Sequence, residues 1–394
     1  MKKLLLVIGI LILFAAEFLK VYLIMPFPGS QQSNSIGIAY FLHNYTWLIR
    51  IAALLLIVYS LVGRFNRWKG WQKGILIALG IFYLYFSYLF NFRFMADKMF
   101  YQPENKRFAA ADSNKVKDDK LVIATVINGE AKAYPIQLIG YHHQVQDTVG
   151  GEPIIVTYCT VCRTGRIYSP VVNGVKEQFR LVGMDHFNAM FEDNTTKSWW
   201  RQATGEAIAG PLKGNRLQEI PSAQMTLHSW LEKYPGTHIL QPDTLFKEAY
   251  ADLDDFDKGT INSGLEKRDS ASWQLKSWVV GIDKGTPRAY DWNDLVQERV
   301  INDSLPGLPV VLILEPDSVS FHTYHRMVNG QSLHFAIDDS TKLLKDAATQ
   351  SLWNYNGQCT DGPLKGATLS PVQSYQEFWH SWQTFHPATS QYHK

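Results

Sequence analysis

Cysteine is scarce in this sequence, and net charge is close to zero. Only Cys159, Cys162 and Cys359 occur among 394 residues, which excludes a scaffold held together by many disulfides. Lys and Arg number 38 against 36 Asp and Glu, so no excess of basic charge points to nucleic acid or to an acidic polymer. We therefore expect no nucleic-acid partner.

Familiar catalytic motifs are also missing. The sequence has no phosphate-binding loop, no dinucleotide-binding glycine pattern and no nucleophile elbow. The residue patterns that mark nucleotide-binding enzymes and serine hydrolases are therefore absent. Whether the protein is an enzyme stays open at this level.

Long apolar runs fill the first 95 residues. We predict transmembrane helices at about 4–25, 43–63 and 75–93, since about 20 residues at about 1.5 Å each span a hydrocarbon core of about 30 Å. A cleaved signal peptide is the alternative for the first run, but that run is long and Pro26–Gly29 is no cleavage site. Glu17 interrupts the first run and Arg50 the second. We expect Glu17 to pair with Lys20 or Arg50.

Loop charge predicts the orientation. Residues 64–73 contain four Lys or Arg and no acid, whereas residues 26–35 contain no charge. Positive loops stay in the cytoplasm, so the N-terminus should be cytoplasmic. We predict an integral protein of the cytoplasmic (inner) membrane, with everything after about residue 95 on the periplasmic, extracytoplasmic side.

Beyond residue 95 the sequence resembles itself. Gly-Glu-Ala-Lys-Ala-Tyr-Pro at 129–135 matches Gly-Thr-Pro-Arg-Ala-Tyr-Asp at 285–291, an offset of 156. Gly-Pro-Leu-Lys-Gly at 210–214 recurs at 362–366, an offset of 152. Asp147 with Asp303 and Trp200 with Trp353 belong to the same ordered series. We predict an internal duplication.

Short β-branched runs separated by Asn-Gly and other glycine turns predict mainly strands. The expected fold is α+β and β-dominated, with two tandem similar units after three transmembrane helices. The predicted boundaries are 1–95 for the membrane domain, 96–245 for the first unit, 246–284 for a linker and 285–394 for the second unit. The linker is rich in Asp, at positions such as Asp252 and Asp257. It lacks the glycine and glutamate of a calcium loop, so we expect it to be solvated.

A family resemblance rests on several motifs. Residues 142–165 read HHQVQDTVGGEPIIVTYCTVCRTG, and they are followed by Glu-Asp, Ser-Trp-Trp, Gly-Pro-Leu-Lys-Gly and a closing His-Pro-x-Thr. Together they resemble the family called domain of unknown function 3179, over about residues 95–394. Many members have Trp where this chain has Tyr141, and Cys-Pro-Leu-Cys-Gly where it has Cys-Thr-Val-Cys-Arg. The resemblance implies no established biochemical function.

The two copies differ where chemistry is expected. At offset 156 Cys159 aligns with Glu315, Cys162 with Ser318 and His142 with Glu298. The first copy also has three additional residues in the stretch that holds Met184, Asp185 and His186. Residues that both copies share are those that a fold needs. We therefore expect the site in the first copy, with the second copy as structural support.

Three hypotheses account for the cysteine pair. The leading one is a metal site for zinc or copper in an extracytoplasmic domain that could act as a metalloenzyme. Its predicted ligands are Cys159, Cys162, His142 and His186, with His143 and Met184 as further candidates and Asp185 orienting the imidazole of His186. The second is a membrane-tethered thiol–disulfide oxidoreductase, with Arg163 and Arg166 favouring a thiolate. The third is a scaffold or ligand-binding module with a structural disulfide.

Strand geometry limits which histidines can be ligands. Adjacent residues of a strand point to opposite faces, so only one of His142 and His143 should face the cysteines, and we favour His142. His322 and His325 also fall on opposite faces of a predicted strand. We do not expect a site at that pair.

Overall fold

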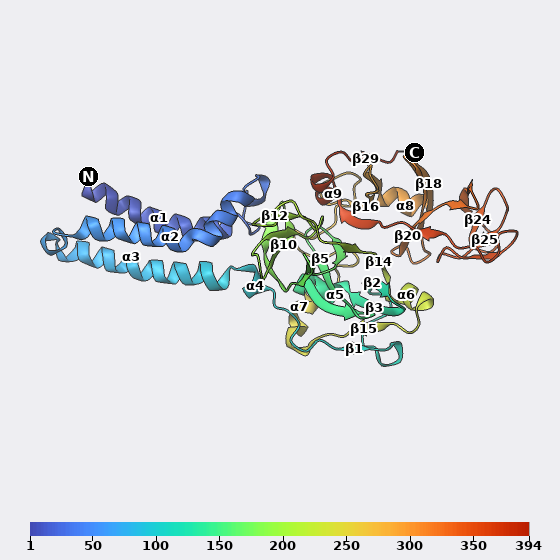
Figure 1. Cartoon of the computed structure of the whole chain (residues 1–394), viewed down its shortest axis with the longest axis horizontal. Helices are drawn as coiled ribbons and strands as arrows, with labels where there is room; N and C mark the ends of the chain where they lie inside the picture. Colours follow the sequence, from blue (N-terminus) through green and yellow to red (C-terminus); the bar gives the residue numbers. More distant parts are fainter. Residues whose placement is uncertain (394) are drawn as a thin grey trace. The chain divides into compact units, whose positions relative to one another are not determined.

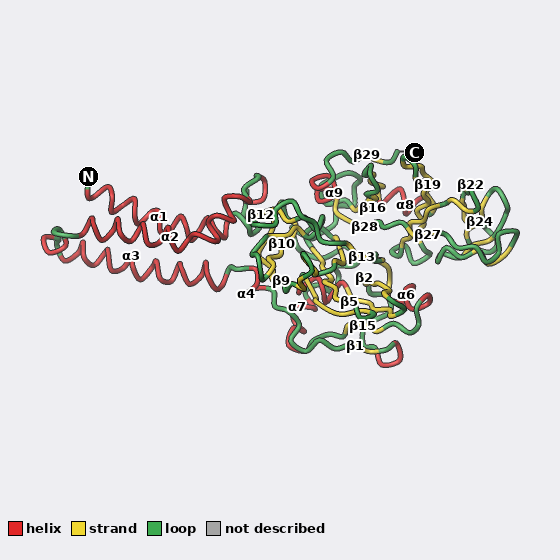
Figure 2. Tube along the Cα trace, in the orientation of Figure 1, coloured by secondary structure: helices red, strands yellow, loops and turns green. Residues whose placement is uncertain are grey.

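The computed structural model describes residues 1–393, and these form two compact units. Unit 1 consists of residues 1–101 and 177–216, and unit 2 of residues 102–176 and the chain from residue 217 onward. Helices predominate at the N-terminus and strands in the rest of the chain (Figure 2). This confirms the predicted class of mixed helices and strands with a β-rich C-terminal region.

Three long helices dominate unit 1 and run side by side (Figure 1). They are α1 (Lys2–Tyr22), α2 (Ile36–Leu61) and α3 (Gly70–Tyr88), followed by a π-helical turn (Leu89–Arg93) and α4 (Ala96–Met99). Each of the three is long and apolar enough to cross a membrane. Helices α2 and α3 begin before the predicted residues 43 and 75, because helical hydrogen bonding extends beyond the purely apolar run.

A polar cluster lies among these helices. The carboxylate of Glu17 accepts hydrogen bonds from Arg50 Nε at 2.5 Å, Asn91 Nδ2 at 2.9 Å and the Tyr83 hydroxyl at 3.0 Å. Lys20 Nζ lies 2.8 Å from the same carboxylate. Glu17 is fully buried. The predicted pairing of Glu17 is confirmed with both cations, as expected for a charge that lipid cannot solvate.

Unit 1 also contains an antiparallel sheet of order β12-β11-β10-β9. Its strands are β9 (Phe179–Asp185), β10 (Asn188–Asp193), β11 (Trp199–Arg201) and β12 (Ala207–Ala209). The Met184 N–H donates to the Ile24 carbonyl at 2.6 Å, and the Phe187 N–H donates to Gln31 Oε1 at 3.2 Å. Residues 177–216 are thereby joined by hydrogen bonds to the loop that follows α1.

The first part of unit 2 contains two main sheets, of orders β1-β15-β3-β2-β14 and β13-β6-β5-β4. The strands of the first are β1 (Phe108–Ala109), β2 (Leu121–Ile127), β3 (Glu130–Pro135), β14 (Ala223–Thr226) and β15 (His238–Leu240). Those of the second are β4 (Gln144–Val149), β5 (Glu152–Cys159), β6 (Thr164–Tyr168) and β13 (Glu219–Ile220). The remaining elements are α5 (Ile136–His142), α6 (Leu227–Lys233), α7 (Lys247–Ala251) and the hairpin β7 (Val171–Val172) with β8 (Val175–Lys176). Alternating apolar residues of both sheets form the core between them.

The second part of unit 2 begins at residue 278 and has sheets of orders β28-β16-β17-β29, β18-β19-β20-β27 and β23-β24-β25-β26. The first two consist of β16 (Trp278–Ile282), β17 (Arg288–Asp291), β18 (Val300–Leu305), β19 (Leu308–Leu314), β20 (Phe321–His325), β27 (Ser370–Pro371), β28 (Tyr375–Phe378) and β29 (Ser390–Gln391). The third consists of β23 (Phe335–Ile337), β24 (Leu344–Asp346), β25 (Leu352–Trp353) and β26 (Cys359–Asp361). The other elements are α8 (Trp292–Glu298), α9 (Trp379–Phe385) and the hairpin β21 (Met327–Val328) with β22 (Gln331–Ser332).

The segment that connects the two parts is partly buried. Phe256 and Ile261 pack into the core of the first part, and Asp257 is buried as well. Asp257 Oδ2 accepts the backbone N–H of Leu121 at 3.0 Å. The expectation of a solvated linker is therefore wrong for these residues, because apolar packing and a backbone donor outweigh the cost of burying the carboxylate.

Candidate functional site

The cysteine pair lies at the tip of the hairpin formed by β5 and β6. Cys159 is the last residue of β5 and is opposite Thr164 in the ladder, and Cys162 lies in the intervening turn. The turn closes through the Arg163 N–H, which donates to the Thr160 carbonyl at 3.2 Å. Both cysteines are fully buried and are thiols rather than a disulfide.

A lysine and a histidine lie against this turn. Lys276 Nζ donates to the Val161 carbonyl, between the two cysteines, at 2.7 Å. His380 Nε2 is 3.1 Å from the same oxygen and 3.2 Å from Lys276 Nζ. The Phe378 N–H donates to the Cys162 carbonyl at 2.9 Å. Two half-buried side chains from later in the chain thus cover the Cys-x-x-Cys turn.

The charges of these groups are coupled. Burial lowers the pKa of the Lys276 ammonium, and the electrostatic interaction with Cys162 and Cys159 opposes that shift. Burial and the neighbouring charge of Lys276 lower the pKa of His380 to about 4. Near neutral pH the turn is therefore covered by an ammonium and an uncharged imidazole. A cation next to a thiol favours the thiolate.

An acid completes this group. The Thr160 hydroxyl, in the same turn, donates to Glu266 Oε1 at 2.6 Å. The charge of Glu266 also opposes the lowering of the Lys276 pKa that burial causes. We call Cys159, Cys162, Lys276, Glu266 and His380 the thiol cluster.

The two arginines that follow the cysteines have other structural roles. Arg163 donates to Gln376 Oε1 at 2.9 Å and to the carbonyl oxygens of Phe256 and Asp257, both at 3.0 Å. Arg166 forms an ion pair with Glu377 at 2.5 Å. Both guanidinium groups are buried where they join the hairpin to the second part of unit 2. The cation at the Val161 carbonyl is Lys276 rather than either arginine.

His142 and His143 do not lie on a strand, so the expectation of opposite strand faces is wrong. His142 ends α5, and His143 follows it with a left-handed backbone, φ +58°. His142 Nε2 is 2.6 Å from the Tyr250 hydroxyl, and His143 Nδ1 is 3.0 Å from the Tyr158 carbonyl. The apolar residues of 136–139 face the core at helical spacing, and this packing favours the helix.

Met184, Asp185 and His186 belong to unit 1, whereas the cysteines and His142 belong to unit 2. His186 Nδ1 lies 2.6 Å from Asp185 Oδ1, and Arg201 Nε donates to Asp185 Oδ2 at 2.8 Å. Burial raises the pKa of Asp185, but its bonds to His186 and Arg201 outweigh burial and lower it. The hydrogen bond to Asp185 raises the pKa of His186. Asp185 thus contacts His186, as the metal hypothesis requires, and Arg201 as well.

No group of three or more His, Cys, Asp and Glu that could hold a metal ion is present within residues 1–393. The structure therefore does not bring the four predicted ligands together as one cluster. It brings Cys159 and Cys162 close to Lys276 and His380 instead. Those two residues were missed because each is more than 100 positions from the cysteines. Residues 285–394, which were expected to be only structural support, contribute His380.

Comparison with known proteins gives one match. A family model described as "Protein of unknown function (DUF3179)" matches residues 101–389. No curated protein and no solved structure matches the chain. The matched range includes the whole thiol cluster and most of the β-rich region.

Proposed function

The chain belongs to the DUF3179 family of proteins of unknown function, and we propose that it is a membrane-anchored thiol–disulfide oxidoreductase whose reacting pair is Cys159 and Cys162. The observation that carries this proposal is the ammonium of Lys276, 2.7 Å from the carbonyl between the two cysteines. A half-buried cation at that position stabilises a thiolate, which is the form that attacks disulfides.

In the proposed reaction, one thiolate of the pair attacks a sulfur of the substrate disulfide. A mixed disulfide forms, and the second cysteine resolves it. The pair loses two electrons and two protons and becomes a disulfide, while the substrate becomes two thiols.

Access to the pair requires a local movement. Both cysteines are buried, whereas Lys276, His380 and Glu266 are only half-buried. Displacement of these side chains would open the turn to a partner. Lys276 and His380 would thereby set both the charge at the pair and the entry to it.

We propose that this chemistry takes place outside the cytoplasm. The basic loop between α2 and α3 supports a cytoplasmic N-terminus and an odd number of crossings supports an extracytoplasmic unit 2. That compartment is oxidising and supplies disulfide substrates. Fusion of alkaline phosphatase to the C-terminus should give an active enzyme, and a cytoplasmic C-terminus would leave it inactive.

We also propose that the β-rich region arose by duplication. Three local arrangements recur at the aligned positions. Asp193 with Trp200 and Asp346 with Trp353 each form a carboxylate–indole bond, of 2.9 and 3.1 Å. Tyr134 with Asp147 and Tyr290 with Asp303 form hydroxyl–carboxylate bonds of 2.7 and 2.8 Å. Trp230 with Thr237 and Trp382 with Thr389 form bonds of 2.8 Å each.

Metal binding by the same thiols is the second candidate. Two fully buried cysteines at x2 spacing favour it, and copper(I) is a soft ion that thiolates select. A nearby ammonium would balance the charge of two thiolates. Zinc would need further ligands, for which His142 and His186 are the sequence-based candidates.

One experiment separates the alternatives. The full chain is purified anaerobically in detergent, its metal content is measured, and its thiols are counted by alkylation before and after mild oxidation and reduction. We expect Cys159 and Cys162 to form a disulfide that dithiothreitol reverses, and the Cys359→Ser control to behave like the wild type. About one equivalent of zinc or copper that Cys159→Ser abolishes would favour the metal site. Unreactive thiols without metal would leave the scaffold hypothesis.

A further inference from the structure

A cavity of about 610 Å³ lies within unit 2. Its walls come from both parts of the unit: β14 and α6 from the first, and β20 and β27 from the second. The volume is within the range of about 300–1,000 Å³ that is usual for small-molecule sites. None of the thiol cluster lines it, so the cavity is separate from the site proposed above.

The wall of this cavity is basic. Lys233, Lys284, His322 and His325 line it, and no Asp or Glu is among the lining residues of the described chain. Lys233 is half-buried, and it forms no ion pair with any residue of 1–393. Burial lowers its pKa, which is the response of a cation without a counter-charge. An anion in the cavity would supply that charge.

A second polar group in the wall lacks a partner. Thr323 is 4 % exposed, and within residues 1–393 its hydroxyl makes no hydrogen bond. A buried hydroxyl without a partner costs about 1–3 kcal/mol, so such groups are rare unless water or a ligand satisfies them. Thr323 lines the cavity, but its hydroxyl oxygen is not exposed to it.

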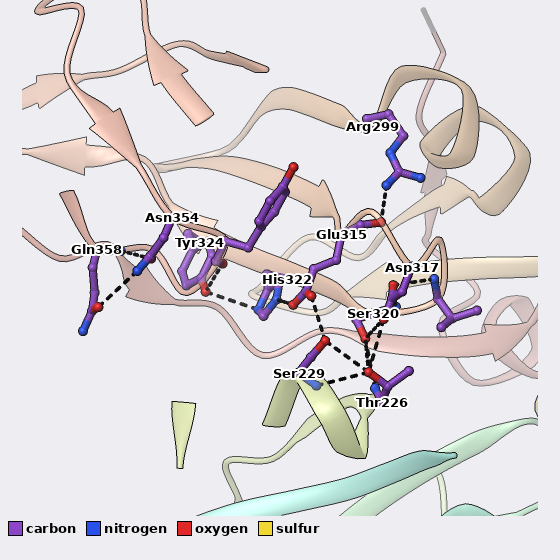
Figure 3. A network of polar contacts seen from close by, with 12 residues as sticks. Thr226, Ser229, Arg299, Glu315, Asp317, Ser320, His322, Tyr324, Asn354 and Gln358 are labelled. Atoms are coloured by element: carbon purple, nitrogen blue, oxygen red, sulfur yellow. Dashed lines mark hydrogen bonds and ion pairs between the residues drawn. The ribbon is translucent and has the colours of Figure 1, made fainter. Parts of the chain in front are cut away.

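A hydrogen-bonded chain fixes the neighbouring part of the wall (Figure 3). His322 Nε2 lies 2.5 Å from Glu315 Oε1, and the other carboxylate oxygen accepts from Ser229 Oγ at 2.7 Å. The Tyr324 hydroxyl donates to the Tyr355 carbonyl at 3.0 Å and lies 3.2 Å from His322 Nδ1. Both ring nitrogens of His322 thus have a hydrogen-bond partner, which fixes the orientation of the imidazole.

Glu315 also joins the two parts of unit 2. Its bond to Ser229 reaches α6, and the Thr226 N–H donates to Ser320 Oγ at 2.9 Å beside it. Lys233, the cation without a counter-charge, ends the same helix. The network therefore holds α6, and with it the base of Lys233, against the strand that carries Thr323.

The rest of the wall is largely apolar. Trp230, Tyr234, Phe321 and Leu308 line the cavity together with Val372. Such a surface accepts a hydrocarbon or an aromatic ring and would exclude a fully hydrated inorganic ion. The ligand that satisfies every part of the wall has an anionic head and an apolar body.

We propose that this cavity binds a small organic acid, with its carboxylate held by Lys233 and its apolar body against Trp230 and Phe321. The size of the cavity and its combination of cations with aromatic rings define the class of ligand. This proposal does not depend on the chemistry of the cysteines.

The test is calorimetric titration of the full chain in phosphatidylcholine nanodiscs, with phenylacetate and hexanoate as probes and their uncharged amides as controls. We expect saturable binding of at least one acid with a Kd below about 1 mM, and binding of the amides at least about tenfold weaker. Lys233→Met should weaken acid binding about tenfold.

Matched variants keep the result interpretable. Lys267→Met, which removes an exposed lysine outside the cavity, and the double variant Cys159→Ser/Cys162→Ser should both bind like the wild type. Lys284→Met provides a second lining variant should Lys233→Met fail to fold, and it should also weaken binding. The proposal is overturned if neither acid binds up to about 10 mM, if the amides bind equally well, or if both lysine variants keep the wild-type affinity.

Discussion

The ammonium of Lys276 lies 2.7 Å from the carbonyl oxygen of Val161, in the turn that joins Cys159 to Cys162, and it interacts electrostatically with both cysteines. Lys276 precedes the second part of unit 2 by two residues, so a cation from the connecting segment serves the hairpin of the first part. The proposed reactivity of the cysteine pair follows from this contact.

Replacing Lys276 by Met should make the thiols less acidic. Without the ammonium, the thiolate loses its stabilising charge, and the alkylation rate near pH 7 should fall about three- to tenfold. The measurement is the pH profile of alkylation of Cys159 and Cys162, followed by mass spectrometry. Lys267→Met, an exposed lysine in the same segment, is the matched control. An unchanged profile in Lys276→Met would contradict the assigned role.

His380 should make stability depend on pH. Its pKa is about 4 in the folded protein and about 6.5 when unfolded. Between these two pKa values the imidazole is protonated in the unfolded chain but not in the folded protein. The contribution of His380 to the free energy of unfolding is therefore present in full above about pH 6.5 and is lost as the pH falls toward 4. The contribution is at most about 3 kcal/mol. The unfolding temperature should fall less steeply between pH 7.5 and 4.5 in His380→Gln than in the wild type. Equal slopes in the two proteins would show that the pKa of His380 is not lowered by folding.

The buried carboxylates Asp193 and Asp346 should be equally important to their sheets. Asp193 accepts from Thr196 and Ser198 as well as from Trp200, and Asp346 makes corresponding bonds. Replacement of either by Ala leaves several buried donors without a partner and should destabilise the fold by about 2–4 kcal/mol.

The free energy of unfolding of the Asp193→Ala and Asp346→Ala variants is measured by tryptophan fluorescence during denaturation. Asp339→Ala, at an exposed position close to Asp346, should cost less than about 0.5 kcal/mol. A large loss in one Asp variant and none in the other would argue against equivalent roles, and thus against the proposed duplication.

The polar cluster among the helices should stabilise unit 1. Glu17→Gln leaves Arg50 and Lys20 without their counter-charge inside the bundle, at a cost of about 3–5 kcal/mol. The amount of folded protein extracted from membranes and its half-life in detergent should both fall. The double variant Glu17→Gln/Arg50→Gln should recover part of the loss. A double variant less stable than Glu17→Gln would mean that the pair is not coupled.

Local patterns predicted much of the architecture. Long apolar runs predicted the three long helices, because a helix that crosses about 30 Å of hydrocarbon needs about 20 consecutive, mostly apolar residues. The Glu17–Arg50 pair followed from the same reasoning, since a charge among such helices requires a partner. Turn residues and β-branched runs likewise predicted the β-rich region.

The predicted site depended on contacts that local patterns do not encode. The order of residues shows which residue types are rare and where they lie, and this singled out Cys159 and Cys162. Folding brings Lys276 and His380 over them, ends a helix at His142, and forms the basic cavity beside Glu315 between the two parts of unit 2. These outcomes depend on packing between segments far apart in the chain, where burial and hydrogen-bond satisfaction outweigh local preference.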